Sequence, residues 1–416
     1  MNRYLHRIQE LEINDDASSL LDSVIFETNI LPNLRVLRFH NSKSIAYIEP
    51  LLSPGLLVLD LTTYYSDVPL ASFFDSCPLL RLGLKSFRLD LHMHGVRSND
   101  SFLQFLCGLE SLESLVLSLG FLDQVSVPQH LLLSPRFREL AFVSHPLTAR
   151  KELRAFFVPP SEIPFRNVQK LHLTIWWLGT MVRLLRPHDQ AFRQLTLFLG
   201  YPAVARTIRS FFTELASSPR RSSLQLVHFA CVASLKHWHK DKPELLTLSY
   251  DTFQPLTVFV HLLDLRIHLA NPISLDDQEL VDLVRNWPLL RVFKLRRADV
   301  LETTDNVKCI TFQGLLALVA ICPALYKVVL TLDGRQVPHG VPVRSEYKTI
   351  TTIRFPGSPI SDPQTVADFL SIHFPSVTTA GNGNVSLWMD DRELGKRWEE
   401  VNEYLAGTRK SARLET

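Results

Sequence analysis

The sequence predicts an α/β solenoid, in which short parallel strands form a curved sheet and helices cover its convex side. Three observations lead to this prediction: an apolar spacing that recurs along the chain, a proline before many of the short strands, and helical patterns ahead of several of those prolines. The 416 residues are 46% hydrophobic and 21% charged, so the chain has enough apolar side chains to build a continuous core.

The apolar spacing has a gap of three residues followed by a gap of two. In the stretch LPNLRVLRF it falls on Leu34, Leu37 and Phe39. A strand with one buried face alternates at every second residue, so the longer first gap marks a turn into the strand. The spacing begins at Ile8, Leu34, Leu56, Leu79, Leu112, Phe137, Val168, Phe192, Leu224, Leu245, Leu262, Leu290, Leu325 and Ile350. The mean interval is about 26 residues, inside the range of leucine-rich repeats, whose signature begins L-x-x-L-x-L. Leu245 and Leu262 are too close together to begin two full repeats.

The context of the spacing repeats as well. A proline precedes the strand in six units, at Pro32, Pro54, Pro78, Pro135, Pro288 and Pro323. Helical patterns precede several of these prolines, for example over 279–284 and 312–319, and Ser274 and Thr311 are candidate N-caps. Proline disfavours the helical conformation of the residue before it and so stops each helix. A unit of helix, proline, strand and loop can bury its apolar edge only against its neighbours, which predicts a solenoid.

The repeats are expected to form one elongated domain over residues 1–389. Residues 390–407 are predicted to form a C-terminal capping helix, with Leu394, Trp398, Val401 and Leu405 on one face and Gly407 at its end. Residues 408–416 are predicted to be a disordered tail.

Composition argues against several classes of function. The formal net charge is only +2, so nothing in the global balance favours nucleic acid. The apolar run Leu315–Ile321 is far shorter than the ~18 residues that span a bilayer. The first fifteen residues contain charges throughout and resemble no signal peptide. Five scattered cysteines support neither a zinc site nor a disulfide framework, so we expect an intracellular protein, in the cytoplasm or the nucleus.

Few residue patterns suggest chemistry. The pairs His92 with His94 and His237 with His239 lack a third ligand at diagnostic spacing, so surface histidines are the preferred interpretation. The glycine-containing stretch 381–384 is interpreted as a simple turn. Cys77 and Cys322 each precede a proline and are expected to be packing residues. We therefore expect no catalytic residues, no cofactor, no metal and no enzymatic activity.

Several short segments occur in an order that suggests a family. They are YLHRIQELEIN at 4–14, the strand entry at 30–37, LLSP at 51–54, DSCP at 75–78, FLCGL at 105–109 and the terminal W-x-x-V-N at 398–402. Together they resemble the leucine-rich-repeat region of F-box proteins that are abundant in mushroom-forming fungi. In that family an F-box docks on the Skp adaptor of a cullin–RING (SCF) ubiquitin ligase, and the repeats select the protein substrate. The family's F-box would precede residue 3, so we expect it to be absent from this polypeptide.

Two functions remain open at this point. The resemblance implies substrate recognition within a ubiquitin ligase, with a Skp-type adaptor as partner only if an F-box exists upstream. The alternative is a free-standing repeat scaffold, or a truncated paralogue without ligase association. Both are non-enzymatic modules that bind a protein partner and involve neither nucleic acid nor membrane.

The residues between the inward leucines predict which surface binds, because side chains alternate across a strand. These positions carry Glu10, Glu12, Arg38, His40 and Asp60 at the amino end and are nearly uncharged in the middle of the chain. Toward the carboxyl end the candidate partner-binding residues on this concave face are Arg266, His268, Lys294, Arg296, Lys327 and Arg354. They predict docking of an acidic or phosphorylated segment, since arginines can pair oxygens bidentately. The alternative interpretation is that they are ordinary solvated strand residues.

Overall fold

The structure is a computed structural model, and the chain in it divides into two compact units, each described here by itself. Unit 1 comprises 1–176 and 187–192, and unit 2 comprises 177–186 and 193–416. The residues that the structure describes are 5–14, 31–41, 45–63, 74, 83–91, 100–119, 128–144, 167–175, 178–185, 192–218, 221–231, 245–297, 308–342, 345–380 and 392–414.

Unit 1 is a sheet of short parallel strands that follow one another in chain order. The strands are β1 (Glu10–Asn14), β2 (Val36–Asn41), β3 (Val58–Thr63), β4 (Ser86–Leu91), β5 (Ser114–Leu119), β6 (Glu139–Ser144) and β7 (Lys170–Ile175). The connections between them include the 3₁₀ helix η2 (Ile45–Leu51) and the helices α5 (Asp100–Cys107) and α6 (Gln129–Leu133).

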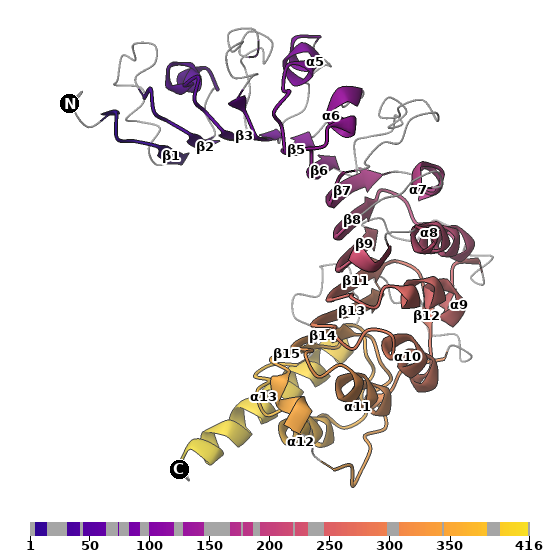
Figure 1. The fold of residues 1–416 in the computed structure, drawn as a ribbon. Coiled ribbons are helices and arrows are strands. Elements are labelled where there is room, and N and C mark those ends of the chain that lie inside the picture. The colour runs from indigo at the N-terminus through magenta and orange to yellow at the C-terminus, as the bar shows by residue number, and fades with distance from the viewer. Residues whose placement is uncertain are drawn as a thin grey trace. The chain divides into compact units, whose positions relative to one another are not determined.

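Unit 2 has the same organisation. Its sheet contains β8 (Gln194–Leu199), β9 (Leu226–Cys231), β11 (Asp264–Leu269), β13 (Val292–Arg297), β14 (Lys327–Leu330) and β15 (Thr352–Arg354), each parallel to its neighbour. Its helices are α7 (Leu178–Leu185), α8 (Ala205–Ser217), α9 (Tyr250–Phe253), α10 (Asp277–Val284), α11 (Phe312–Ile321), α12 (Pro363–His373) and α13 (Arg392–Leu414), with the 3₁₀ helices η4 (Arg221–Ser223), η7 (Gln254–Val258) and η8 (Ser345–Thr349). In Figure 1, helices α8 to α11 lie along one side of the unit 2 strands. The predicted class, an α/β repeat fold with parallel strands backed by helices, is confirmed.

The proline before a strand occupies a tight turn. Leu34 N–H donates to Leu31 O at 3.1 Å across Pro32, and Leu290 N–H donates to Trp287 O at 3.0 Å across Pro288. Proline is favoured at the second position of such turns, because its φ is already set near the required value. The proline therefore shapes the turn that positions the first apolar residue of the repeat, and at Pro288 this turn follows α10, which has already ended at Val284.

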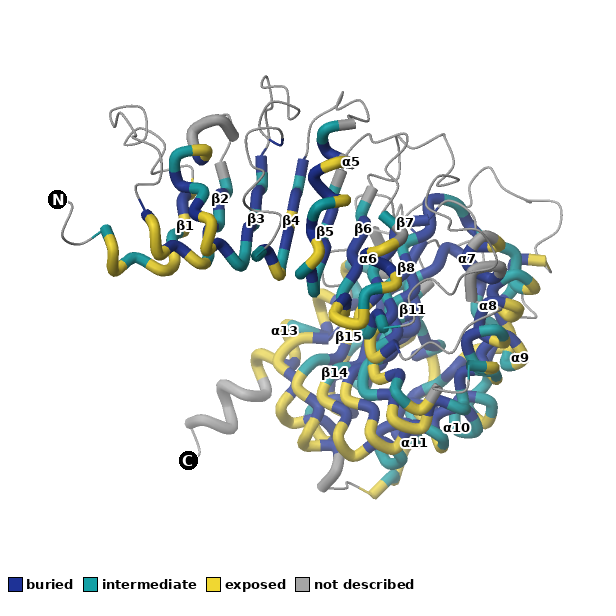
Figure 2. Tube along the Cα trace, turned by 45° about the horizontal axis from the view of Figure 1, so that its top comes forward, coloured by how far each residue is buried: buried dark blue, intermediate teal, exposed yellow. Residues whose placement is uncertain are grey.

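The core lies between the strands and the helices. The inward positions of β2, Leu34, Leu37 and Phe39, are fully buried, and the corresponding positions of β3 are buried to the same extent. Burial alternates with partial exposure along the strands, as Figure 2 shows for β3 and β4. Burial of each methylene contributes about 0.8 kcal/mol to the free energy of folding, so burial of the inward leucines is the main contribution to the stability of each repeat.

Two of the predicted strand positions are wrong. The fourth strand uses Leu84, Phe87 and Leu89, five residues beyond the predicted start at Leu79. Both stretches fit the apolar spacing, but the Phe87 ring packs against Phe74 and Phe105, with ring centroids 6.4 and 5.4 Å away. Aromatic burial in the core therefore decides the register of β4.

The second wrong position is at Leu245, which is 45% exposed and starts no strand of the main sheet. The segment after it forms β10 (Leu248–Ser249), which pairs only with β12 (Ile273–Ser274). Helix α9 begins directly afterwards at Tyr250, which leaves no room for another strand. The repeat that contains β11 is therefore long and begins at Leu262.

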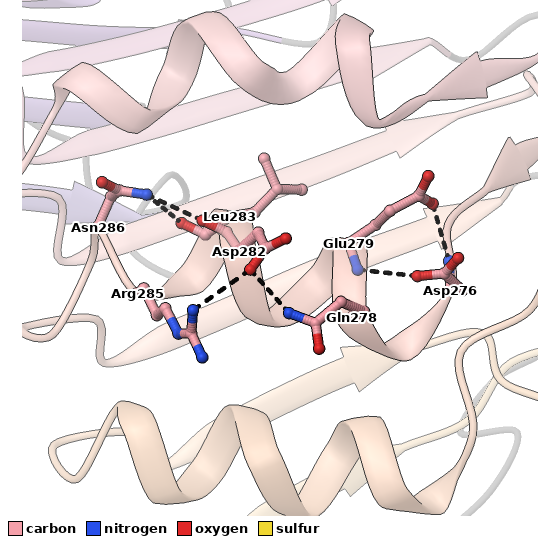
Figure 3. A network of polar contacts seen from close by, with 7 residues as sticks. All are labelled: Asp276, Gln278, Glu279, Asp282, Leu283, Arg285 and Asn286. Atoms are coloured by element: carbon pink, nitrogen blue, oxygen red, sulfur yellow. Dashed lines mark hydrogen bonds and ion pairs between the residues drawn. The ribbon is translucent and has the colours of Figure 1, made fainter.

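Helix α10 begins at a capping box (Figure 3). Asp276 Oδ1 accepts from Glu279 N–H at 2.8 Å, and Glu279 Oε2 accepts from Asp276 N–H at 3.0 Å. This arrangement satisfies two otherwise unpaired backbone donors. The predicted N-cap Ser274 is therefore wrong, because Ser274 lies in β12, whereas the predicted N-cap Thr311 of α11 is confirmed.

The C-terminal helix differs from the prediction in its length. Helix α13 runs from Arg392 to Leu414, past Gly407 and through most of the segment predicted to be disordered. Gly407 does not adopt the left-handed conformation of a helix-ending glycine, since among the described glycines only Gly340 and Gly357 have positive φ. Trp398 is 1% exposed and packs on Phe355 of the last repeat, with ring centroids 5.2 Å apart. The capping of the array by residues 390–407, and a single domain over 1–389, remain predictions.

Candidate functional site

The predicted binding residues lie on the side of the unit 2 strands that faces away from the helices. Strand pairing aligns them in rows across the sheet. One row contains Arg266, Lys294, Val329 and Arg354, on β11, β13, β14 and β15. His268 pairs with Arg296 in a second row, and Lys327 pairs with Val292 in a third. The structure thus brings all six candidates onto neighbouring strands of one face.

Arg266 is neutralised within its own strand. Its Nε donates to Asp264 Oδ1 at 2.8 Å and its Nη2 donates to Asp264 Oδ2 at 2.5 Å. The hydrogen bond to Asp264 raises the pKa of Arg266 above its usual value. Bidentate arginine–carboxylate pairs form strong, charge-assisted hydrogen bonds, and the two charges cancel. Arg266 is therefore a weaker candidate for binding an anion than its place in the row suggests.

Lys294, Lys327 and Arg354 form a group of cations that have no ion-pair partner among the described residues. Among the described residues, no Asp or Glu oxygen comes within ion-pair distance, 4.0 Å, of these three side chains. Partial burial lowers the pKa of Lys294, the charges of Arg266, Lys327 and Arg354 lower it further, and the charge of Asp264 opposes the shift. Lys294 and Lys327 are partly exposed and Arg354 is exposed, so all three are accessible to solvent. We call these residues the basic triad.

Arg296 lies beside the basic triad but is more enclosed. Burial and the neighbouring charge of Arg354 lower its pKa, and its Nε is buried without a hydrogen-bond partner. An unpaired buried donor costs about 1–3 kcal/mol, so a hydrogen-bond acceptor beside this Nε would be favourable. Arg296 therefore extends the basic surface along β13, and His268 lies beside it in the same row.

The equivalent face of unit 1 is electrically balanced. There one row contains Glu12, Arg38, Asp60 and Arg88 on β1 to β4, so the sign of the charge alternates. Arg88 Nη1 lies 3.8 Å from Asp60 Oδ2. Burial raises the pKa of Asp60, while the charges of Arg88 and His40 oppose the shift. The sequence prediction missed Arg88, because starting the fourth repeat at Leu79 places that residue out of register.

Few groups in the described residues suggest covalent or metal chemistry. Within the described ranges no three His, Cys, Asp or Glu side chains gather closely enough to hold a metal ion. Cys322 is fully buried, its Sγ donates to Trp287 O at 3.4 Å, and burial raises the pKa of its thiol to about 12. The histidine pairs at 92–94 and 237–239, Cys77 and the turn at 381–384 lie outside the described residues. In the described part of the chain no helix is both long and apolar enough to cross a membrane.

Comparisons with known proteins give no family. No family model matches the chain, and no curated protein matches it. Among solved structures, the chain is similar to one in the crystal structure of the Rad7 and Elc1 complex in yeast, with 13% identity and a TM-score of 0.42 over 83% of this chain and 82% of that chain. It is also similar to the tropomodulin C-terminal domain of Caenorhabditis elegans, with 12% identity and a TM-score of 0.17 over 57% of this chain and 99% of that chain. At these scores neither likeness bears on what this chain binds.

Proposed function

We propose that this chain is a non-enzymatic protein-interaction module that binds a negatively charged protein segment on the strand face of unit 2. The observation that supports the proposal is the contrast between the two strand faces. In unit 1 the charges alternate and compensate one another, whereas the basic triad and Arg296 of unit 2 form no ion pair among the described residues, and the nearby carboxylate of Asp264 is already paired with Arg266. Uncompensated charges on adjacent strands add into one field that attracts an oppositely charged partner.

The form of the surface also suits a protein partner. Strand faces of repeat proteins are extended and rigid, so they bind long segments without reorganising. Recognition of acidic or phosphorylated motifs by clustered cations is one of the common modes of peptide binding. Holding like charges together without an ion-pair partner is unfavourable in the free protein. A bound anion would relieve that repulsion.

A capture experiment tests this proposal. The purified chain and its strand-face variant, Lys294→Glu with Arg354→Glu, are each immobilised, and the proteins that they retain are compared. The control is Arg206→Glu with Lys396→Glu, which changes charge equally at exposed positions of α8 and α13. We expect a protein that the wild type and the control retain and the strand-face variant loses, with cross-links between that protein and β13 to β15. Identical retention by all three chains would contradict the proposal.

We further propose, from the resemblance to fungal F-box proteins, that the bound protein is a substrate of a cullin–RING ubiquitin ligase. The order of the short motifs from residues 4–14 to 398–402 supports this proposal. The test is co-purification of the gene product from its native cells with a Skp-type adaptor. Absence of the adaptor from a preparation that still contains the captured partner would favour a free-standing scaffold.

A further inference from the structure

The basic triad is arranged around a small apolar floor. Lys294 and Arg354 flank Val329 in the same row, one on each neighbouring strand. Lys327 lies on the same strand as Val329, two residues earlier and therefore on the same face. Although Val329 occupies a solvent-facing position, it is only 8% exposed. The methylene stems of neighbouring cationic side chains can shield such a residue while their charged ends stay in water.

The spacing allows the three charged ends to meet. Lys294 and Arg354 are two strands apart, which places their Cα atoms about 9.6 Å from each other. Lys327 is one strand and two residues away from each, at about 8 Å. A point about 4 Å above Val329 is then about 6 Å from the Cα atoms of Lys294 and Arg354 and about 8 Å from the Cα atom of Lys327. A lysine side chain extends roughly 6 Å and a hydrogen bond adds about 3 Å, so all three side chains reach this point. A single anionic group can therefore contact all three side chains.

From this geometry we propose that Lys294, Lys327 and Arg354 form a cradle for the phosphate monoester of a phosphorylated protein segment. A phosphoryl group carries close to two negative charges and three acceptor oxygens, so it can engage three cationic donors simultaneously. A carboxylate carries one charge and is satisfied by one bidentate arginine, as Asp264 is by Arg266. The inference rests on the proposed function and names the chemical class of its partner.

The same observations disfavour nucleic acid. Binding to a phosphodiester backbone requires cations that follow the strand over many phosphates. On the described strand face of unit 2, the cations without an ion-pair partner lie on β13, β14 and β15, and the neighbouring Arg266 of β11 is held by Asp264 of the same strand. Acidic residues stand between the cations in the row of unit 1, and the whole chain carries a net charge of only +2. The cradle is thus sized for one phosphate group.

Direct binding with defined probes tests the cradle. Fluorescence polarisation compares three labelled pools of degenerate peptides that differ only in a fixed central residue, which is phosphoserine, serine or aspartate. A labelled single-stranded DNA dodecamer is the fourth probe. We expect the phosphoserine pool to bind about tenfold or more tightly than each of the other three probes, because charge-assisted hydrogen bonds to phosphate are the strong contacts. Equal binding of the phosphoserine and aspartate pools, or tighter binding of the DNA, would overturn the inference.

Conservative variants locate the site. Lys294→Met, Lys327→Met and Arg354→Met remove a charge but keep an apolar stem over Val329, so the fold should survive, which urea unfolding checks. Each should weaken binding of the phosphoserine pool about tenfold. Arg206→Met on α8 and Lys396→Met on α13 are matched controls and should change binding less than about twofold. Unchanged affinity in the three triad variants would place the site elsewhere and refute the cradle.

Phosphatase treatment separates failure of the cradle from failure of the proposed function. If the captured partner loses its affinity after treatment, the cradle is supported. If it still binds after treatment, and still depends on Lys294 and Arg354, the strand face binds protein but the phosphate inference is wrong. If no partner depends on the strand face, the proposed function is wrong, and the peptide pools test the cradle by themselves.

Discussion

Gly314 of α11 is the position where the packing of adjacent repeats can be tested most sharply. A Cβ atom added there would lie 2.2 Å from Asp277 Oδ1 and 2.9 Å from Asp277 Cγ, on the neighbouring helix α10. That carboxylate is not free to move, because it accepts hydrogen bonds from Thr311 N–H at 2.7 Å and from Thr311 Oγ1 at 2.6 Å. The variant Gly314→Ala must therefore displace Asp277 and break at least part of this link.

Two opposing terms set the magnitude. Replacing a helical glycine with alanine normally stabilises by about 0.5–1 kcal/mol. Hydrogen bonds to a charged group contribute about 1.5–3 kcal/mol each, so loss of the two bonds to Asp277 would cost about 3 kcal/mol or more. We expect Gly314→Ala to lower the free energy of unfolding of unit 2 by about 2 kcal/mol. The assay is urea unfolding followed by circular dichroism and tryptophan fluorescence, with the slope checked for constancy.

A double-mutant cycle gives the control. In the Asp277→Ala background the obstructing carboxylate is gone and only Ile310 Cγ2, at 3.0 Å, stays close to the added Cβ, so Gly314→Ala should recover part of the ordinary helix-propensity gain of about 0.5–1 kcal/mol. The effect of the same substitution should thus reverse sign between the two backgrounds. Stabilisation by Gly314→Ala in the otherwise unchanged protein would refute the claim that these two helices are held at this distance by Asp277.

Three further predictions concern buried groups of the described chain. Trp398→Ala should lower the free energy of unfolding by about 3–5 kcal/mol, since it removes a fully buried ring and the hydrogen bond from Nε1 to Ser358 O at 2.9 Å. Limited proteolysis should then release α13 earlier than in the wild type. Release at the wild-type rate would contradict the docking of α13 through Trp398. Burial lowers the pKa of His373 below its ordinary value of 6.5, so the unfolded chain binds the proton more readily and stability should fall as the pH drops below about 6.5. His373→Leu should flatten this part of a plot of urea midpoint against pH, and an unchanged slope would show that other groups cause it. In the native protein Cys322 should resist a thiol reagent that labels the exposed Cys107, because burial raises the pKa of the Cys322 thiol to about 12. Mass mapping of the labelled peptides measures this difference, and equal labelling of the two cysteines would contradict it.

Much of the fold was predictable because the repeat is a local pattern. The gap of three and then two residues recurs along the chain, six of its copies follow a proline, and the inward side chains it identified at Leu34, Leu37 and Phe39 are fully buried. Where two overlapping stretches both fit the pattern, as at Leu79 and Leu84, the sequence offers no means of choosing. The choice depends on Phe87 packing against side chains from neighbouring repeats. Such contacts join residues whose separation in sequence varies from repeat to repeat.

The candidate site divides in the same way. Alternation along each strand was enough to predict which side chains face away from the helices, and strand pairing places all six of the predicted residues on that face. Their electrostatic state was not predictable from alternation alone. Asp264 lies two residues from Arg266 and on the same face, yet only the folded geometry shows that its carboxylate holds the guanidinium bidentately. The effective basic surface is therefore smaller than the predicted one and is centred on Val329.

By itself the sequence determined the repeating unit, the parallel α/β architecture and the polarity of each strand face, because these follow from periodicities within about 30 residues. The tertiary structure decided the register of β4, the pairing of β10 outside the main sheet, and the role of Asp277 as a link to Thr311 in the next repeat. It also decided which of the described cations remain without an ion-pair partner. These features depend on distances between side chains that packing brings together, and hydrogen bonds and ion pairs act only over a few ångströms.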